Sequence, residues 1–161
     1  MESHVPETSQ SIIVPLDGSA LAEAAIPFAI ALAQRRHLGI DLVHVHATGV
    51  RTQNAPIVDP RWDNDRSKDM GDAIRGLGER YARETGVNVS VTVLRGEPAA
   101  MLMNYATEQE AALVAMTTHG RSGFSHAWFG SVTEHVVHAA KPCVAEATSA
   151  VRCHGDERCF L

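Results

Sequence analysis

The sequence has few lysines, no long apolar run and no apolar N-terminal segment, and each absence excludes a class of protein. Only two of its 14 basic residues are lysines and the formal net charge is −5, so it has no basic stripe of the kind that nucleic-acid-binding proteins carry. No apolar run approaches the ~20 residues of a membrane-spanning helix. The first ten residues are polar, unlike a signal peptide. We therefore expect a cytoplasmic protein with no nucleic-acid or membrane partner.

Several catalytic signatures are missing as well. No Gly-x-x-x-x-Gly-Lys-Ser/Thr loop is present, so no lysine braces the terminal phosphates of a nucleotide. The sequence also lacks the Gly-x-Ser-x-Gly elbow and the full glycine fingerprint of dinucleotide-binding domains. Cys143 lies in an apolar run without the context of a cysteine protease, which predicts an unreactive core thiol. These absences argue against a protein whose main role is catalysis.

Histidine and cysteine are the remaining candidates for a metal site. His44 and His46 share one face of a predicted strand, but no cysteine or carboxylate lies at ligand spacing from them. Cys153 and Cys159 lie near the end of the chain, at a spacing that matches no zinc pattern. We therefore expect no metalloenzyme site, and we interpret the last residues as a frayed tail.

Apolar segments of strand length alternate with helical patterns along the chain. Strands are predicted at 11–16, 40–46, 87–93, 111–116 and 142–147. Helical patterns follow the first four of them. This alternation predicts an α/β fold in which one domain, residues 11–147, forms an open, Rossmann-like parallel five-stranded sheet with helices on both faces. Residues 1–10 are expected to be a flexible N-terminus and residues 148–161 a C-terminal tail.

Three local features add detail to this fold. Pro27 interrupts the first helical pattern, so we expect a kink or a break there. Thr48–Arg66 has no sustained period and is too long for an ordinary connector, which predicts a mobile flap before a helix at Asp69–Thr85. Pro142 at the start of the last strand suits a sheet edge. Because an exposed edge must be covered or paired, we expect a homodimer through Pro142–Ala147.

The strand order follows from where the polar residues lie. The two chemically rich loops come after the first strand, at Asp17–Ser19, and after the fourth strand, beyond Met116. Ligands of such sheets bind outside the carboxyl ends of the strands, at the point where the strand order reverses. Both loops can serve one site only if their strands are neighbours. The sequence therefore predicts the strand order 3-2-1-4-5.

The loop after the fourth strand predicts an anion site. The apolar strand ends at Met116, Gly120 and Gly130 lie in the loop, and a helix begins at Ser131. Backbone N–H groups and the helix dipole attract a phosphate to such a helix N-terminus. The same segment, Ser131–Glu134, is also a capping box, in which the serine has a structural role alone. Both interpretations stay open at this point.

On these residues the sequence resembles a universal stress protein. The resemblance covers residues 11–147 and rests on four motifs that are specific only in combination. They are Ile13-Val-Pro-Leu-Asp-Gly-Ser19, Leu42-Val-His-Val45, Gly96-Glu-Pro98, and Thr118-His-Gly-Arg-Ser-Gly123 with Gly130-Ser131. The fold that the resemblance implies, a five-stranded parallel sheet in the order 3-2-1-4-5, agrees with the order predicted from the loops.

The resemblance also implies a ligand. ATP-binding members of the family carry a glycine, two residues, a second glycine, nine residues, and Gly-Ser or Gly-Thr. This chain has the second glycine and the final Gly-Ser, whereas Thr117 replaces the first glycine. The resemblance implies ATP with Mg²⁺ and gives Asp17 the ribose or the metal. It assigns the remaining adenine, nucleoside and phosphate contacts to Pro15, Val45, Met116, Thr117, His119, Gly120, Gly130, Ser131, Val132 and Thr133.

Alternatives remain for single residues and for the function. Asp17 can instead cap the first helix, and Arg121 either reaches a phosphate or extends into solvent. Our first hypothesis is a universal stress protein that binds Mg-ATP and acts as a nucleotide-responsive regulator in stress response. The second is a dimeric interaction module without nucleotide. The third is a slow ATPase, in which Asp17 and Mg²⁺ orient a water.

Overall fold

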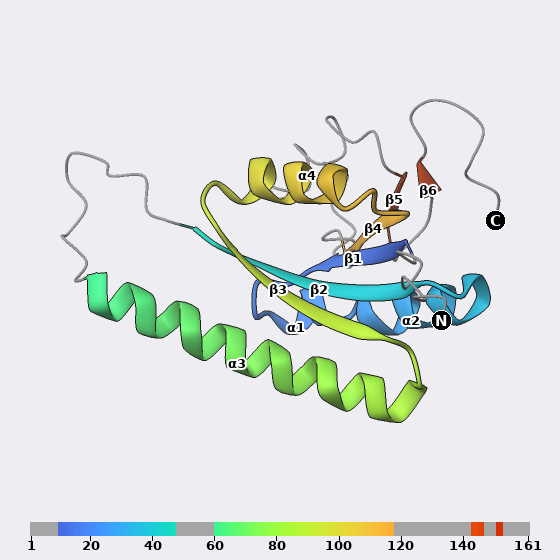
Figure 1. The fold of residues 1–161 in the computed structure, drawn as a ribbon, viewed down its shortest axis with the longest axis horizontal. Coiled ribbons are helices and arrows are strands. Elements are labelled where there is room, and N and C mark those ends of the chain that lie inside the picture. Colours follow the sequence, from blue (N-terminus) through green and yellow to red (C-terminus); the bar gives the residue numbers. More distant parts are fainter. Residues whose placement is uncertain (1–9, 48–59, 118–142, 147–150, 153–161) are drawn as a thin grey trace, which may run out of the picture.

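The structure, a computed structural model, describes residues 10–47, 60–117, 143–146 and 151–152 (Figure 1). Its strands are β1 (Ser11–Pro15), β2 (Gly39–His46), β3 (Val89–Arg95), β4 (Leu113–Met116), β5 (Cys143–Glu146) and β6 (Val151–Arg152). Its helices are α1 (Ala20–Glu23), α2 (Ile26–Arg36), α3 (Pro60–Thr85) and α4 (Pro98–Glu108). Strands and helices alternate from β1 to β4, as the sequence pattern predicts.

The strands form one sheet in the order β3-β2-β1-β4-β5-β6. Strands β1 to β5 are parallel, and β6 runs antiparallel to β5. The predicted α/β class and the order 3-2-1-4 of the first four strands are confirmed. The predicted count of five strands is wrong, because Val151–Arg152 adds a sixth, too short to show a sequence pattern. The strand predicted to be the sheet edge therefore has a neighbour on each side.

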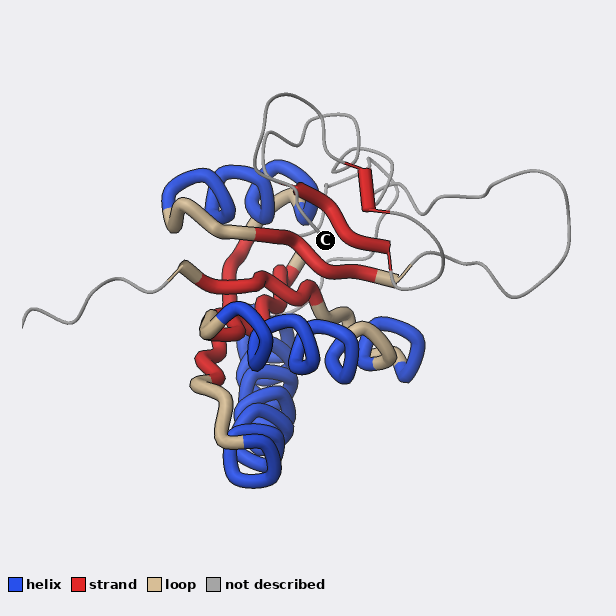
Figure 2. The backbone as a smooth tube through the Cα atoms, turned by 90° about the vertical axis from the view of Figure 1, so that its right-hand side faces the viewer, coloured by secondary structure: helices blue, strands red, loops and turns tan. Residues whose placement is uncertain are grey.

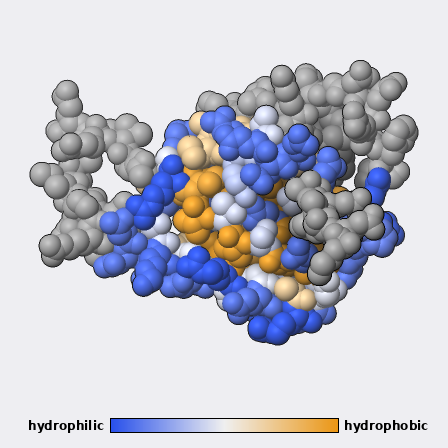
Figure 3. All heavy atoms as spheres, in the orientation of Figure 1, coloured by the Kyte–Doolittle hydropathy of each residue, from blue (hydrophilic) through white to orange (hydrophobic). Residues whose placement is uncertain are grey.

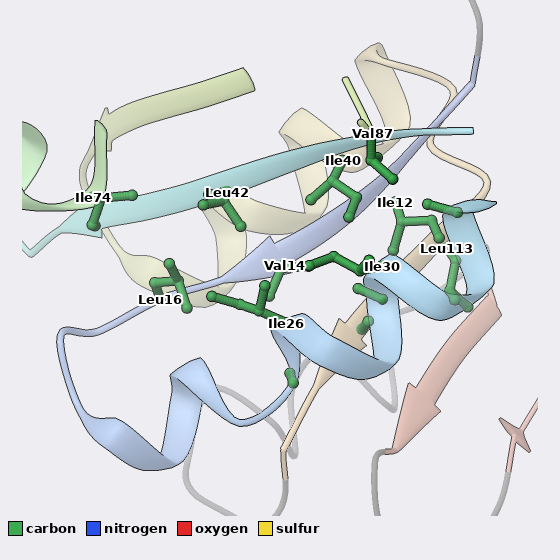
Figure 4. Packing of buried hydrophobic residues seen from close by; sticks show 14 residues of the cluster. Ile12, Val14, Leu16, Ile26, Ile30, Ile40, Leu42, Ile74, Val87 and Leu113 are labelled. Carbon is green, nitrogen blue, oxygen red and sulfur yellow. The ribbon is translucent and has the colours of Figure 1, made fainter. Parts of the chain in front are cut away.

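Helices cover both faces of the sheet (Figures 1 and 2). Because successive strand side chains point to opposite faces, Ile12 and Val14 pack toward α2 and α3, whereas Ile13 packs toward α4. Figure 4 shows the larger cluster, in which Ile26 and Ile30 of α2 meet the strand residues. Full burial of each such side chain contributes roughly 1.5–3 kcal/mol. The two apolar clusters thus fix the central strands β1, β2 and β4.

The first helical pattern is broken into two helices. Ser19 caps α1, and its hydroxyl oxygen accepts a hydrogen bond from Ala22 N at 3.2 Å. The helix ends at Glu23, and α2 begins at Ile26 with Pro27 in its first turn. A proline is tolerated there because the first amides of a helix have no intrahelical acceptor. Of the two outcomes expected at Pro27, the structure shows the break.

Helix α3 begins nine residues earlier than predicted, at Pro60 rather than Asp69. The predicted flap at Thr48–Arg66 is therefore wrong for residues 60–66, which are helical, and residues 48–59 lie outside the described segments. Pro60 lies within the predicted flap, but a proline also fits the first helical turn.

Strand β2 carries a buried carboxylate, that of Asp41, on the face of the sheet that α4 covers. Asp41 is only 4% exposed and accepts hydrogen bonds from the hydroxyls of Ser90 at 3.1 Å, Thr92 at 3.2 Å and Tyr105 at 2.7 Å. Ser90 and Thr92 alternate with valines along β3, and Tyr105 belongs to α4. A charge is tolerated at this depth only because its oxygens are hydrogen-bonded. We call these four residues the Asp41 cluster.

Strand β3 is an edge strand of the sheet and lies on the face of the molecule seen in Figure 1. Val89, Val91 and Val93 are half-buried there. Figure 3 shows apolar side chains gathered in the middle of this face, between the polar surfaces of α3 and α4. Within the described segments, no helix combines the length and the apolar character that crossing a membrane requires.

Candidate functional site

The described residues of the predicted site lie at the carboxyl ends of three neighbouring strands. Pro15 and Asp17 are at the end of β1, Val45 is near the end of β2, and Met116 and Thr117 are at the end of β4. Strand β1 lies between β2 and β4, so the strand order reverses here. This is where α/β sheets bind ligands. The predicted neighbourhood of β1 and β4 is confirmed, and the roles of the single residues stay predictions.

The turn that carries Asp17 is attached to β2 by two hydrogen bonds. Leu16 N donates to the carbonyl oxygen of Val43 at 2.8 Å. The imidazole Nδ1 of His44 lies 2.8 Å from the carbonyl oxygen of Leu16. Because a carbonyl oxygen only accepts, Nδ1 carries the proton. His44 is thus a buried residue that fixes the backbone immediately before Asp17.

Within the turn, the carboxylate of Asp17 is exposed and points toward the start of α1. Ser19 N donates to Asp17 Oδ1 at 2.9 Å, while the hydroxyl of Ser19 caps the helix. The capping role considered for Asp17 therefore falls to Ser19. Gly18 has φ +83°, and a Cβ there would lie 2.7 Å from Cε of Met70. The left-handed backbone conformation favours glycine here, whereas the contact with α3 involves only the flexible end of the Met70 side chain.

The electrostatics of the turn keep Asp17 ionised. Burial of part of the carboxyl acts to raise its pKa, but hydrogen bonds from Ser19 outweigh burial, and the pKa of Asp17 is lowered overall. The electrostatic influence of the nearby His44 ring is a smaller effect in the same direction. An exposed, ionised carboxylate at the end of β1 can accept a hydrogen bond from a ribose hydroxyl or bind a divalent cation.

Thr117 connects the end of β4 to α1. Its hydroxyl Oγ1 donates to the carbonyl oxygen of Leu21 at 2.8 Å, across 96 residues of sequence. The resemblance identifies Thr117 as the replacement of a motif glycine and as a residue that lines the nucleoside. The contact shows that the threonine side chain has a partner on the Asp17 side of the site.

The other described site residues are more enclosed. Met116 is 7% exposed and belongs to the apolar cluster under α4, together with Val43 and Leu102. It can therefore offer its backbone to a ligand more readily than its side chain. Val45 packs against the same cluster and is half-buried, as is Pro15. Both can present one apolar surface to a planar base.

The predicted phosphate contacts lie outside the described residues. These are His119, Gly120, Arg121, Gly130, Ser131, Val132 and Thr133. Where the structure does describe the chain, no group of three or more histidine, cysteine, aspartate or glutamate residues could hold a metal ion. The rings of His44 and His46 are 6.4 Å apart, centroid to centroid. The cysteines of the C-terminal tail also fall outside the described segments.

Two contacts at the site were missed by sequence reasoning. The sequence predicts His44 as a packed strand residue and Thr117 as a nucleoside-lining replacement of a motif glycine, but it predicts neither hydrogen bond. Their partners, Leu16 and Leu21, lie 28 and 96 residues away along the chain. No local pattern encodes a side-chain bond to a distant backbone carbonyl. The strand order brings these partners together, and the sequence did predict that order.

Comparison of the sequence with known protein families identifies the family to which the chain belongs. The family model described as "Universal stress protein family" matches residues 8–145. The chain belongs to the universal stress protein family. A curated universal stress protein of Mycolicibacterium smegmatis is 32% identical over 132 residues, which are 80% of this chain. This chain spans 42% of the length of that relative, and 48% of a universal stress protein of Mycobacterium tuberculosis that is also 32% identical.

Solved universal stress proteins share the fold of this one. Universal stress protein UspA of Lactobacillus plantarum matches with a TM-score of 0.71 and 24% identity, over 86% of this chain and 97% of that chain. A universal stress protein of Archaeoglobus fulgidus in complex with dAMP matches with a TM-score of 0.61 and 23% identity, over 89% and 98%. A universal stress protein in complex with cAMP matches with a TM-score of 0.63 and 19% identity, over 89% and 99%.

Proposed function

We propose that this universal stress protein binds ATP with Mg²⁺ at the carboxyl ends of β1, β2 and β4, and acts as a cytoplasmic, nucleotide-responsive regulator in stress response. The observation that carries the proposal is the ionised Asp17 turn, placed beside the end of β4, after which the sequence predicts a glycine-bearing loop. Two structural neighbours in complex with adenine nucleotides support this choice of ligand.

The chemistry of each residue decides which part of the nucleotide it would contact. Pro15 and Val45 supply apolar surface for the adenine, and the backbone after β4 at Met116 and Thr117 lines the nucleoside. Asp17 accepts from the ribose or coordinates Mg²⁺, which would neutralise phosphate charge. In the loop and helix predicted after β4, His119 would adjoin the nucleoside, and the phosphates would be bound by Gly120, Arg121, Gly130, Ser131, Val132 and Thr133.

Regulation follows from the position of the ligand between two loops. A nucleotide that contacts the loops after β1 and β4 at the same time is bound only when both are in place. Binding therefore shifts the population toward the ordered arrangement of the two loops, by as much as the affinities for the two arrangements differ. A partner protein that recognises this arrangement would sense the nucleotide without any chemical step.

Calorimetric titration of Mg-ATP into the wild type and into Asp17→Asn tests the proposal. Asparagine keeps an oxygen that can accept from Ser19 N, so the substitution removes the charge and spares the turn. We expect the Kd for Mg-ATP to rise about tenfold, or about 1.4 kcal/mol. Glu108→Gln is the matched control, because the end of α4 lies at the opposite end of the sheet from Asp17.

Three results would count against parts of the proposal. If the wild-type protein binds no Mg-ATP at millimolar concentration, nucleotide binding is excluded as its function. A Kd for Asp17→Asn within twofold of the wild type removes Asp17 from the site. Binding that survives Gly130→Asp, which places a carboxylate in the predicted phosphate loop, removes that loop. Phosphate release measured in the same samples separates a binding protein from a slow ATPase.

A dimeric interaction module without nucleotide is the second candidate. Strand β6 pairs with β5 only at Val144 and Ala145. A homodimer through Pro142–Ala147 therefore has to extend the sheet beyond β6 or displace it, rather than use a free edge. Light scattering at tens of micromolar should give the mass of two chains. The mass of one chain at every concentration would exclude the dimer.

A further inference from the structure

The side chain of Thr117 links the end of β4 to α1, the helix that follows the Asp17 turn. Thr117 is the first residue after β4, and Leu21 lies in α1, four residues after Asp17. The hydroxyl of Thr117 donates to the carbonyl oxygen of Leu21 at 2.8 Å. Among the described residues, this is the one hydrogen bond that joins the Asp17 turn and α1 to the end of β4.

The break between α1 and α2 makes the acceptor available. In an unbroken helix the carbonyl of Leu21 would accept from the amide of residue 25. Here Ala25 N donates to Ala22 instead, and the Leu21 carbonyl accepts from Ala24 N at 3.1 Å. A carbonyl oxygen at such a helix end has capacity for a second donor. Thr117 supplies that donor from a different part of the chain.

The bond matters because of what else holds the turn. On the β2 side, the turn is attached through Leu16, whose amide donates to Val43 and whose carbonyl accepts from His44. On the β4 side, the Thr117 hydroxyl makes the corresponding attachment. Asp17 is thereby anchored from both of its neighbouring strands, although its own side chain is exposed.

We propose that Thr117 is a positioning residue of the nucleotide site, whose hydroxyl holds the Asp17 turn at a fixed distance from the end of β4. The inference rests on the proposed function and deepens it. It gives a reason for threonine at the position where the ATP-binding pattern has glycine. Without this bond only a fraction of the molecules would hold the Asp17 turn in its binding position relative to the end of β4. The apparent affinity for the nucleotide would then fall in proportion to that fraction.

The test compares Thr117→Val, which keeps the shape and removes the donor, with Thr117→Ser, which keeps the donor. In calorimetry we expect Thr117→Val to raise the Kd for Mg-ATP about fivefold, which converts to about 1 kcal/mol, the net contribution of one hydrogen bond. Thr117→Ser should stay within twofold of the wild type. Thr107→Val is the matched control, because the Thr107 hydroxyl also donates to a carbonyl, that of Met103 within α4.

Thermal unfolding and hydrogen exchange of the amides in residues 19–24 accompany the titrations. Faster exchange of these amides in Thr117→Val alone supports the proposal. A lower Tm of Thr117→Val with an unchanged Kd overturns it, because the bond would then stabilise the fold without positioning the site. Equal losses in Thr117→Val and Thr117→Ser overturn it too. If the wild type binds no Mg-ATP, the proposed function fails and this inference with it, whereas an unchanged Kd in Thr117→Val leaves the proposed function intact.

Discussion

Tyr105 and Tyr81 are the two tyrosines of the chain, and they differ in what their hydroxyl groups contact. Tyr105 donates to the buried carboxylate of Asp41 at 2.7 Å, whereas the hydroxyl of Tyr81 has no hydrogen-bond partner in the described segments. We predict that Tyr105→Phe lowers the free energy of unfolding by about 1–3 kcal/mol, because a buried charge loses a donor. Tyr81→Phe should change it by less than about 0.5 kcal/mol. Urea denaturation measures both, and equal effects would contradict the prediction.

The raised pKa of Tyr105 predicts that the stability of the protein falls at alkaline pH. Burial raises the pKa of Tyr105, its hydrogen bond to Asp41 and the charge of that carboxylate raise it further, and Thr92 acts in the opposite direction. A raised folded-state pKa means that the neutral phenol stabilises the fold below the unfolded-state value of about 10. This contribution is lost as pH rises through the folded-state pKa. The stability difference between wild type and Tyr105→Phe should thus be constant below about pH 10 and shrink above it.

Asp17 predicts a loss of stability at acid pH, whereas Tyr105 predicts one at alkaline pH. The lowered folded-state pKa of Asp17 contributes stability at neutral pH, and this contribution is lost as pH falls below about 4, where the unfolded state takes up the proton first. Asp17→Asn should therefore have a shallower loss of stability between about pH 4 and pH 2 than the wild type. Unfolding curves over that range measure the slope. Parallel curves for the two proteins would show that the carboxylate is not stabilised in the fold.

At the scale of elements, two glycines of α3 have different surroundings. A Cβ at Gly76 would meet nothing within 4 Å, whereas a Cβ at Gly78 would lie 3.0 Å from Cγ2 of Val91 in β3. Gly76→Ala should therefore stabilise the protein by roughly 0.5–1 kcal/mol, because alanine loses less backbone entropy in a helix. Gly78→Ala should destabilise it by about 1–3 kcal/mol through overpacking. Denaturation midpoints of the two variants measure the contrast, and a shift of both in one direction would contradict it.

The elements that sequence reasoning predicted well have strong local signals, and the ones it missed do not. Pro98 and the carboxylate of Glu97, which accepts from Ala99 and Ala100, mark the start of α4 within the chain itself. Pro60 has two meanings, loop punctuation or first helical turn, and only packing of α3 on the sheet decides between them. Strand β6 has two residues, which is fewer than any periodicity can show. Strand β6 is recognised as a strand only because it pairs with β5, and a pairing between two segments cannot be read from the two residues alone.

At the scale of the whole molecule, the strand order determines what the site can be. Reasoning from two polar loops predicted that β1 and β4 are neighbours, and this placed Asp17 near Thr117 before any contact was known. The bonds that fix the turn were not predictable in this way, because they join side chains to backbone carbonyls on other elements. The alternation of apolar segments predicts the parallel sheet, and the positions of the polar loops predict its strand order. The anchoring of the site depends on where individual side chains end up after folding.

A ligand held between these loops should stabilise the whole domain. Any ligand that binds the folded state alone adds RT ln(1 + [L]/Kd), which is about 2.7 kcal/mol at a hundredfold excess over Kd. For a chain of this length each kcal/mol corresponds to roughly 2–4 °C in Tm, so saturating Mg-ATP should raise Tm by about 5–10 °C. Asp17→Asn at the same nucleotide concentration should show a smaller rise, because its Kd is higher. A rise of equal size in both proteins would place the nucleotide away from Asp17 and return the Asp17 turn to a purely structural role.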